Sequence, residues 1–259
     1  MTQGSIDRHC EEYLAGGLTV LRGLVPPPLI ADLRREAAVA AEIARGRSGP
    51  QAQRLQPVWS YDGFDHGPFR EFLDLPELRA VVAATLSPDH RPSDRMALFI
   101  EPQRDAWCGA WHRDWGNVPG VDLAEFFRTA ADPRMYNQLN APLYDDHSLW
   151  VVPGSDRRAD TPQERAAFAA YPPEGPDLRD GMTAPEREAE SLRYARRMPG
   201  GAPLLLHAGD VAFYRACIWH LGCYLPYVRR ATLHDSFLCD ADRDWQASVR
   251  RIQQAARTA

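Results

Sequence analysis

The residues best suited to chemistry lie in the segment Trp111-His112-Arg113-Asp114-Trp115-Gly116. Residues two apart on a strand point to the same face, so His112 and Asp114 can reach one metal ion together. A third ligand must come from elsewhere in the chain, and His220 is the best candidate, near the end of a strand expected after Gly209-Asp210. Two imidazoles and one carboxylate on one face leave coordination positions open, as in the iron(II) oxygenases that bind a keto acid and O2 there. The sequence therefore predicts an iron site formed by His112, Asp114 and His220.

An arginine follows the distal histidine in the run Val228-Arg229-Arg230-Ala231-Thr232-Leu233. If this run is a strand, Arg229 shares a face with Ala231 and Leu233 and looks towards the core. A buried arginine needs a carboxylate partner, and a dicarboxylic keto acid would supply one through a bidentate pair. Arg229 is therefore the expected keto-acid ligand. A register shift of one residue would put Arg230 in its place, so Arg230 is the alternative.

Two further amides and one further histidine bear on this site. Gln138 and Asn140 share a face of an expected central strand, where polar groups must be satisfied, and we expect them to hold the keto acid or the substrate. His234 lies on the Arg230 face and is expected to point away from the metal. Structural or surface roles are expected for all the remaining histidines, which are His9, His66, His90, His147, His207 and His234.

The strands that must position these residues begin near residue 95. Short apolar runs between turn residues predict strands at 96–100, 135–143, 149–152, 203–206, 211–214 and 228–237, after an early strand at 17–22. Apolar residues three and four apart, or helix-compatible stretches, predict helices at 6–15, 29–45, 77–86, 162–170, 185–197 and 242–256. Many short strands with turns between them favour a sandwich or barrel.

The length of 259 residues suits a single domain, 1–259. Residues 1–94 are expected to form a mostly helical support, residues 95–240 the barrel strands, and residues 241–259 a C-terminal helix. Residues 156–200 interrupt the strands and are rich in Arg, Glu, Asp and Pro. A long excursion between two strands of a compact domain is usually a lid or binding loop, so a lid is expected there.

Composition excludes several classes of protein. All 30 residues counted as Lys+Arg are arginines, which excludes enzymes that need a lysine amine, such as Schiff-base and PLP enzymes, and also a Walker A nucleotide site. The net charge of −5 gives no electrostatic case for nucleic-acid binding. No run approaches the roughly 20 apolar residues that span a bilayer, so no membrane partner is expected. A small-molecule substrate is the remaining expectation, and the sequence indicates no oligomeric state.

The cysteines indicate a reducing compartment. There are 5 of them, an odd number, with no CxxC pair, and the N-terminus lacks a basic start followed by an apolar run. Reduced thiols in a cytoplasmic protein are therefore expected.

The chain resembles the phytanoyl-CoA dioxygenase family of iron(II)/2-oxoglutarate oxygenases in segments that cover nearly its whole length. Residues 17–24 followed by a helix are similar to the family's N-terminal strand ending in Arg-Gly-Leu, and residues 111–116 to its tryptophan-flanked His-x-Asp. Residues 149–155, Leu-Trp-Val-Val-Pro-Gly-Ser, resemble its Pro-Gly-Ser signature. Residues 208–231 resemble its Gly-Asp strand, distal histidine and keto-acid arginine.

The resemblance implies a double-stranded β-helix, a jelly-roll or cupin-like barrel that is mainly β with flanking helices. It implies Fe(II), with 2-oxoglutarate and O2 as cosubstrates, and hydroxylation or another oxidation of a small molecule with release of succinate and CO2. The family's substrates include secondary metabolites. Asp114 argues against halogenation, because halogenating relatives bind chloride in place of that carboxylate. Asp156 departs from the family, which commonly has a histidine after Pro-Gly-Ser.

Two other functions stay open at this stage. The first is a non-catalytic barrel that binds a small molecule, which the intact triad and arginine argue against. The second is the same fold holding another metal, such as zinc, for hydrolysis. The absence of a spare acid or base near the triad makes that the weaker alternative.

Overall fold

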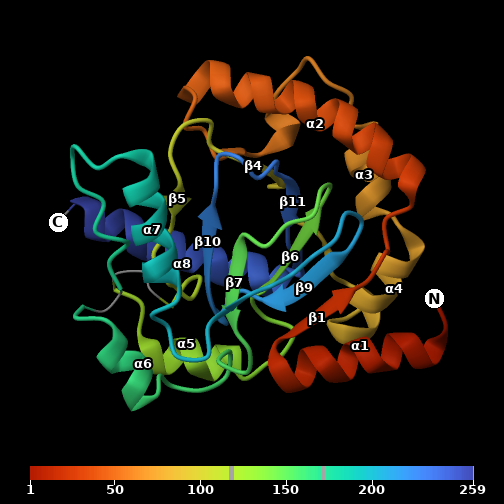
Figure 1. Ribbon diagram of the computed structural model, residues 1–259. Coiled ribbons are helices and arrows are strands. Elements are labelled where there is room, and N and C mark those ends of the chain that lie inside the picture. The colour runs from red at the N-terminus through yellow and green to blue at the C-terminus, as the bar shows by residue number, and fades with distance from the viewer. Residues whose placement is uncertain (117–119, 171–172, 259) are drawn as a thin grey trace.

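Two antiparallel sheets form the centre of the molecule, and helices cover their outer faces (Figure 1). The computed structural model describes residues 1–116, 120–170 and 173–258. The larger sheet has the strand order β1-β9-β6-β11-β4-β2, the smaller one β5-β10-β7-β8, and a short pair joins β12 to β3.

The strands are mostly short. Their bounds are β1 Leu18–Leu21, β2 Arg54–Leu55, β3 Arg91–Pro92, β4 Ala97–Ile100, β5 Trp107–Cys108, β6 Asn137–Pro142, β7 Leu149–Val152, β8 Ala202–Pro203, β9 Val211–Arg215, β10 Trp219–Tyr224, β11 Ala231–Asp235 and β12 Phe237–Leu238. The helices are α1 Gln3–Gly16, α2 Pro27–Ser48, α3 Gly67–Leu73, α4 Pro76–Thr85, α5 Leu123–Ala130, α6 Pro162–Ala167, α7 Ala184–Ala195 and α8 Asp240–Thr258, with a 3-10 turn at Val58–Ser60.

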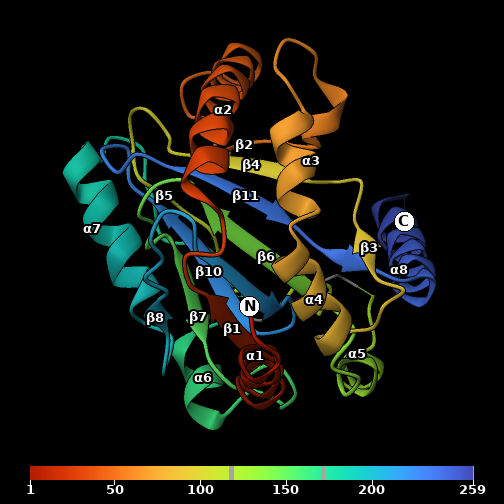
Figure 2. The same ribbon diagram turned by 90° about the vertical axis from the view of Figure 1, so that its right-hand side faces the viewer.

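Helices α1 to α4 cover the outer face of the six-stranded sheet (Figure 2). Helix α2 begins at Pro27, where the missing N–H costs nothing because the first helical N–H groups have no partner within the helix. Its buried residues Leu29, Leu33, Ala37, Ala40 and Ala44 recur at helical spacing and form one apolar stripe. The stripe belongs to the largest apolar core, which the sheet completes from its own side.

A second core lies outside the four-stranded sheet. The end of α7 contributes Tyr194 and Ala195, and Met198 follows directly after it. They are buried with Trp111 and Trp219, the latter on β10. The second half of α7 is therefore anchored against the smaller sheet.

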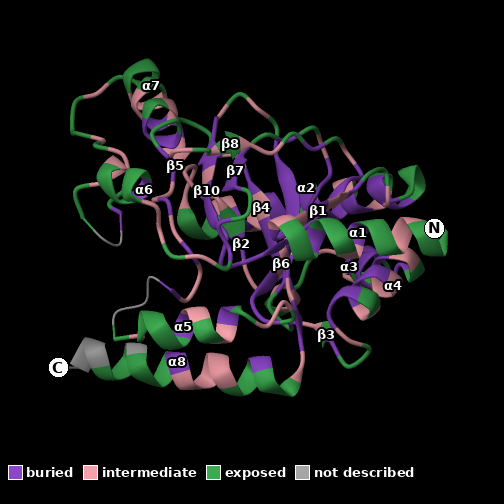
Figure 3. Ribbon diagram, turned by 90° about the horizontal axis from the view of Figure 1, so that it is seen from below, coloured by how far each residue is buried: buried purple, intermediate pink, exposed green. Residues whose placement is uncertain are grey.

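Helices α5 and α8 lie side by side at one end of the two sheets (Figure 3). Phe126 of α5 stacks on Tyr136, whose ring also meets Trp245 of α8 edge to face. This aromatic contact fixes both helices next to the segment that carries Asp114, because Trp115 also packs on Trp245.

The expected fold class is confirmed only in its coarser form. The protein is a mixed structure of helices and antiparallel sheets, and the prediction of a mainly β fold was wrong in its balance. Helices α3 and α5 were not predicted, because each is shorter than the windows in which apolar periodicity is recognised. The strand expected at 203–206 is reduced to Ala202–Pro203. Within the described residues, no helix combines the length and apolarity needed to cross a membrane.

Candidate metal centre

A backbone bridge sets the two histidines side by side. The amide of His112 donates to the carbonyl of His220 and the amide of His220 donates to the carbonyl of His112, both at 3.0 Å. Their ring centroids lie 4.3 Å apart. Residues paired directly across an antiparallel bridge project to the same side, so both imidazoles face the interior between the sheets.

Each histidine presents Nε2 inward because a main-chain carbonyl engages its Nδ1. The Nδ1 of His112 lies 2.8 Å from the carbonyl oxygen of Ala110, and the Nδ1 of His220 lies 2.9 Å from that of Ile218. A carbonyl can only accept, so Nδ1 carries the proton and the Nε2 lone pair is free in the neutral ring. Burial, reinforced by the neighbouring His112, lowers the pKa of His220 to about 4, which keeps that ring neutral.

Asp114 reaches the same point from a turn. The amide of Asp114 donates to the carbonyl of Ala216 at 2.9 Å, and Trp115 then adopts a left-handed φ of 67° that turns the chain away. Asp114 Oδ1 lies 3.3 Å from His112 Nε2. Its other oxygen, Oδ2, accepts a hydrogen bond from Gln138 Nε2. Gln138 therefore holds the carboxylate through Oδ2, while Oδ1 faces His112.

The electrostatics of the cluster keep Asp114 charged. Burial raises the pKa of Asp114, but the hydrogen bond with His112 and the charges of His220 and His112 outweigh it, and the net shift is well below the usual range. Burial lowers the pKa of His112, and Asp114 more than reverses this. An ionised carboxylate beside imidazole lone pairs is a set of metal donors.

The three predicted ligands come together. Ligand atoms of His112, Asp114 and His220 all lie within 4.8 Å of one another. The side chains of His112 and Asp114 are 38% and 30% exposed, which leaves the cluster open on one side. The donor set and the orientation of both imidazoles fit a metal with open coordination positions.

A cavity of about 210 Å³ adjoins this cluster. Arg230 lines it, is 4% exposed and forms an ion pair from Nε to Asp146 Oδ2 at 2.9 Å. Its Nη1 is buried and has no hydrogen-bond partner in the part of the chain that the structure describes. The ring of Tyr224 lies 3.8 Å from the guanidinium carbon, and a Cβ on Gly222 would lie 2.6 Å from that ring, so glycine makes room for it.

Arg229 lies elsewhere, so the expected face of this strand was wrong. Arg229 is exposed and sits over the ring of Tyr144, 4.2 Å from its centre. Ala231 and Leu233 do point into a core, but it is the core under the helices, on the side of the sheet away from the metal candidates. Both faces of the strand are buried. The apolar residues on the Arg229 face therefore did not show which face lines the space between the two sheets.

Because the interior face of this strand is the opposite of the one expected, the expectation that His234 points away from the metal was also wrong. Its ring lines the cavity next to Asp114, stacks on Phe99 at 4.7 Å and bonds through Nδ1 to Asn140 Oδ1 at 2.7 Å. Burial, with the nearby charge of Arg230, lowers the pKa of His234 to about 4. His234 therefore faces the candidate metal centre as a neutral ring.

Gln138 and Asn140 also line this cavity, on the face expected from their spacing. Gln138 orients Asp114, and the Oε1 of Gln138 is buried with no partner among the residues described. Asn140 orients His234. Both amides are thus adjacent to the ligand cluster.

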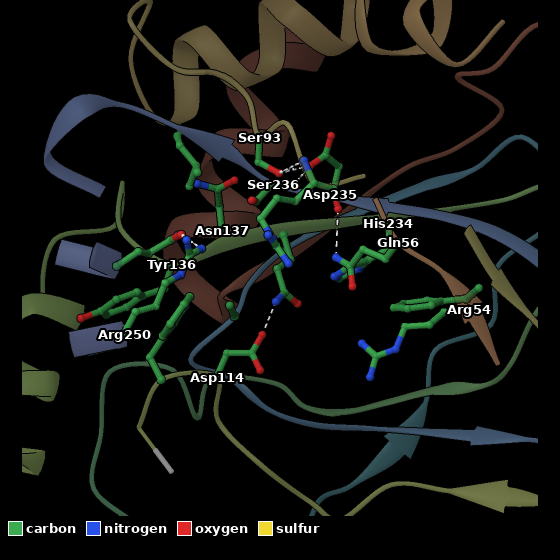
Figure 4. Close-up of a pocket in the computed structure, with 17 residues that line it drawn as sticks. Arg54, Gln56, Ser93, Asp114, Tyr136, Asn137, His234, Asp235, Ser236 and Arg250 are labelled. Atoms are coloured by element: carbon green, nitrogen blue, oxygen red, sulfur yellow. Dashed lines mark hydrogen bonds between the residues drawn. The ribbon is translucent and has the colours of Figure 1, made fainter. Parts of the chain in front are cut away.

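A larger pocket of about 670 Å³ opens on the other side of Asp114 (Figure 4). Its wall includes Gln246 and Arg250 of α8 and the turn 93–95. Figure 4 shows Arg54 and Arg250 on two sides of the pocket, with Asp114 between them in this view. None of the described residues of 156–200 lines this pocket or the smaller cavity, so the expected lid segment contributes no wall to either.

Two arginines that support the site were not singled out in the sequence. Arg113 is fully buried on the side opposite to His112, donates to the carbonyls of Ser155 and Cys217, and pairs with Asp160 at 2.9 Å. Alternation of side chains along this segment could have indicated that Arg113 points away from the site, because it lies between His112 and Asp114 in the sequence.

The second is Arg215, at the end of β9. It pairs with Asp156 at 3.0 Å, and both side chains are almost fully buried. Asp156 therefore holds the turn after β7 against β9. The sequence signal for this pair was Asp156 itself, since the family that the sequence resembles commonly has a histidine at that position.

Comparison of the whole fold with solved structures finds similar chains. AviO1 from Streptomyces viridochromogenes Tue57 is 20% identical, with a TM-score of 0.57 over 93% of this chain and 98% of that chain. The epimerase SnoN, solved in complex with Fe3+, alpha ketoglutarate and nogalamycin RO, is 14% identical, with a TM-score of 0.58 over 92% and 85%. The non-heme alpha ketoglutarate dependent carbocyclase SnoK from nogalamycin biosynthesis is 15% identical, with a TM-score of 0.55 over 92% and 84%.

These likenesses establish the fold. The chain has the fold that these three solved structures share. No family model matches the sequence, and no curated protein matches it.

Proposed function

We propose that this protein is an iron(II)/2-oxoglutarate-dependent oxygenase of the phytanoyl-CoA dioxygenase type, built on a double-stranded β-helix. The observation that carries the proposal is the convergence of His112, Asp114 and His220 beside a buried arginine with an unpartnered Nη1. The three ligand atoms suit Fe(II), and the orphan guanidinium nitrogen suits a carboxylate. The fold shared with SnoN and SnoK supports the assignment.

Each residue has a distinct role in this proposal. His112 and His220 bind iron through Nε2, with Nδ1 engaged by the chain, and Asp114 binds through Oδ1 while Gln138 holds Oδ2. Arg230, in place of Arg229, binds the distal carboxylate of 2-oxoglutarate from within the smaller cavity. Asn140 acts indirectly, by fixing the ring of His234.

Bound iron and 2-oxoglutarate would supply the oxidising chemistry, with O2 consumed and succinate and CO2 released. The protein's own contribution is geometric. Aromatic side chains of the smaller cavity exclude water from the cosubstrate, and the larger pocket holds the substrate against Asp114.

The proposed substrate is a small molecule, in the natural-product class to which nogalamycin belongs. The lining of the larger pocket includes Arg54, Arg95 and Arg250 together with amides. Such a wall favours an oxygen-rich or anionic molecule over a hydrocarbon chain. Hydroxylation is the proposed outcome, and a product that gains one oxygen atom distinguishes it from the epimerisation and carbocyclisation named for SnoN and SnoK.

The direct test is iron binding and succinate release. Anaerobic titration should give one iron(II) per chain at the triad in the wild type, and each of His112→Ala, Asp114→Ala and His220→Ala should lose it while remaining folded. Aerobic incubation with iron(II) and 2-oxoglutarate should release succinate with the wild type and with none of these three variants. His147→Ala, an exposed histidine away from both pockets, is the matched control.

The outcomes separate the alternatives. Wild-type-like iron binding in His220→Ala would overturn the ligand assignment. Iron binding without any succinate release, across a substrate screen, would favour a non-catalytic barrel. Hydrolysis supported by zinc, with no dependence on 2-oxoglutarate, would favour a hydrolase.

A further inference from the structure

A second cluster of metal-binding side chains lies where α8 begins. His90, Cys239 and Asp242 bring their ligand atoms within 4.8 Å of one another. His90 comes from the turn before β3, Cys239 directly precedes α8, and Asp242 lies in its first turn. Figure 2 shows β3 next to α8 at this point. His90 and Asp242 are each 2% exposed, and none of the three lines either pocket of the iron site.

Two of the distances between these ligand atoms fit a small tetrahedral ion, and the third is within 4.8 Å. Asp242 Oδ2 lies 3.3 Å from His90 Nε2 and 3.4 Å from Cys239 Sγ. Zinc bonds of about 2.0 Å to N and O and about 2.3 Å to S place tetrahedral ligand atoms about 3.3–3.5 Å apart. At the candidate iron site, His112 Nε2 and Asp114 Oδ1 are also 3.3 Å apart. The cluster therefore has the dimensions of a coordination shell.

The Nε2 atom of His90 is available to bind a metal ion. This nitrogen is buried and has no hydrogen-bond partner among the described residues, and its contact with Asp242 Oδ2, at 3.3 Å, is longer than the usual N–H···O distance of about 2.9 Å. Leaving a buried ring nitrogen without a partner is unfavourable. Ser87 Oγ bonds to Nδ1 at 2.8 Å and so orients the ring, as partners outside the coordination shell do for metal-bound histidines.

We propose that His90, Cys239 and Asp242 bind a structural zinc ion, separate from the iron site, with water as the fourth ligand. A thiolate, an imidazole and a carboxylate form a zinc donor set, whereas the iron triad contains no sulfur. The ion ties the start of α8 to the turn before β3. Because α8 carries Gln246 and Arg250 into the larger pocket, the zinc site fixes one wall of that pocket.

Cobalt(II) is the probe that distinguishes the two sites. Metal-free protein loaded with cobalt should show a thiolate-to-cobalt charge-transfer band in the near ultraviolet, which a site without sulfur cannot produce. The band should persist in His112→Ala, vanish in Cys239→Ser and persist in Cys10→Ser. Cys10 is a matched control, since its thiol is free and its Sγ lies 3.2 Å from the hydroxyl of Thr85, away from the proposed zinc ligands in the sequence.

Zinc binding provides the second measurement. His112→Ala should retain one tight zinc equivalent, and zinc should raise its unfolding temperature. The double variant His112→Ala/Cys239→Ser should lose both effects while keeping the circular dichroism of the folded protein. No charge-transfer band in folded wild type, a band that survives Cys239→Ser, or an equal zinc shift in both His112→Ala proteins would overturn the proposal. None of these results depends on whether the triad binds iron.

Discussion

Arg230 is the residue whose charge matters most for binding a diacid. It is buried, Asp146 occupies only its Nε, and its free Nη1 belongs to a side chain that lines the smaller cavity. Burial raises the pKa of Asp146, but Arg230 and Thr232 outweigh this and lower it to about 2. The pair therefore stays ionised, and the guanidinium is fixed before any ligand arrives.

Replacing Arg230 should weaken 2-oxoglutarate binding far more than replacing Arg229. Loss of the bidentate partner should cost about 2–5 kcal/mol of binding free energy. Arg230→Lys keeps a charge for Asp146 but loses the fork, so it should remain folded and still bind weakly. The measurement is the dissociation constant for 2-oxoglutarate in the presence of iron(II) without O2. A weakened constant in Arg229→Ala, with Arg230→Lys unchanged, would return the assignment to Arg229.

Asp235 should make the protein's stability depend on pH. Burial raises the pKa of Asp235 to about 6, against hydrogen bonds from Ser93 and the Ser236 amide, and its Oδ2 has no hydrogen-bond partner within the described ranges. A raised carboxyl pKa means that the folded state favours the proton. This contribution is fully present below the unfolded pKa near 4 and is lost as pH rises through about 6.

The neutral variant Asp235→Asn should remove this loss. Relative to its own value at pH 4, the wild type should lose up to about 3 kcal/mol more unfolding free energy than Asp235→Asn by pH 7. Urea denaturation at pH 4, 5, 6 and 7 measures the difference. A constant gap between the two proteins across this range would show that Asp235 is not protonated in the fold.

At the scale of elements, the insert 156–200 combines an anchored half and an open half. Ser191 and Tyr194 of α7 are buried against the smaller sheet, whereas most described residues from 174 to 183 are exposed and outside regular structure. The walls of the larger pocket come instead from α8 and the turn 93–95. That residues 156–200 close over the site as a lid therefore stays a prediction. Helix α8 is the alternative element that could close the larger pocket.

Hydrogen exchange can decide between the two elements. In the metal-free protein, amides at 174–183 should exchange fast and those at 191–195 should be protected, because only the latter are helical and buried. If the insert is a lid, a bound substrate should slow exchange at 174–183. Slowing confined to α8 would identify that helix as the closing element.

At the scale of the whole molecule, the proposed ligands would join the two sheets. His220 belongs to β10 of the smaller sheet, and Arg230 directly precedes β11 of the larger one. Iron and 2-oxoglutarate bound together would bridge these sheets through one continuous set of contacts. Ligand binding should therefore stabilise the whole domain and not one loop.

This linkage predicts a measurable gain in stability. At concentrations about 100-fold above the dissociation constant, ligands that bind only the folded state add about 2.7 kcal/mol to the unfolding free energy. Anaerobic thermal unfolding with iron(II) and 2-oxoglutarate should show this increase in the wild type and its absence in His220→Ala. An equal increase in both proteins would mean that the ligands bind elsewhere.

The convergence of the three proposed metal ligands could be predicted in part, because the pattern of His112 and Asp114 is local. They are two residues apart, and alternation placed them on one face. His220 was expected at the end of the strand after Asp210, but it lies at the start of the next strand, β10. The helices with long apolar stripes, such as α2, were predictable because their pattern is also local.

Only the tertiary structure decided what alternation leaves open. Alternation defines two faces of β11, but both are buried, and only the position of helices α1 to α4 shows that the Arg230 and His234 face is the interior. The wall formed by α8 and the meeting of His90, Cys239 and Asp242 depend on contacts between residues about 150 apart in the sequence. Such contacts follow from how whole elements pack, which no local pattern encodes.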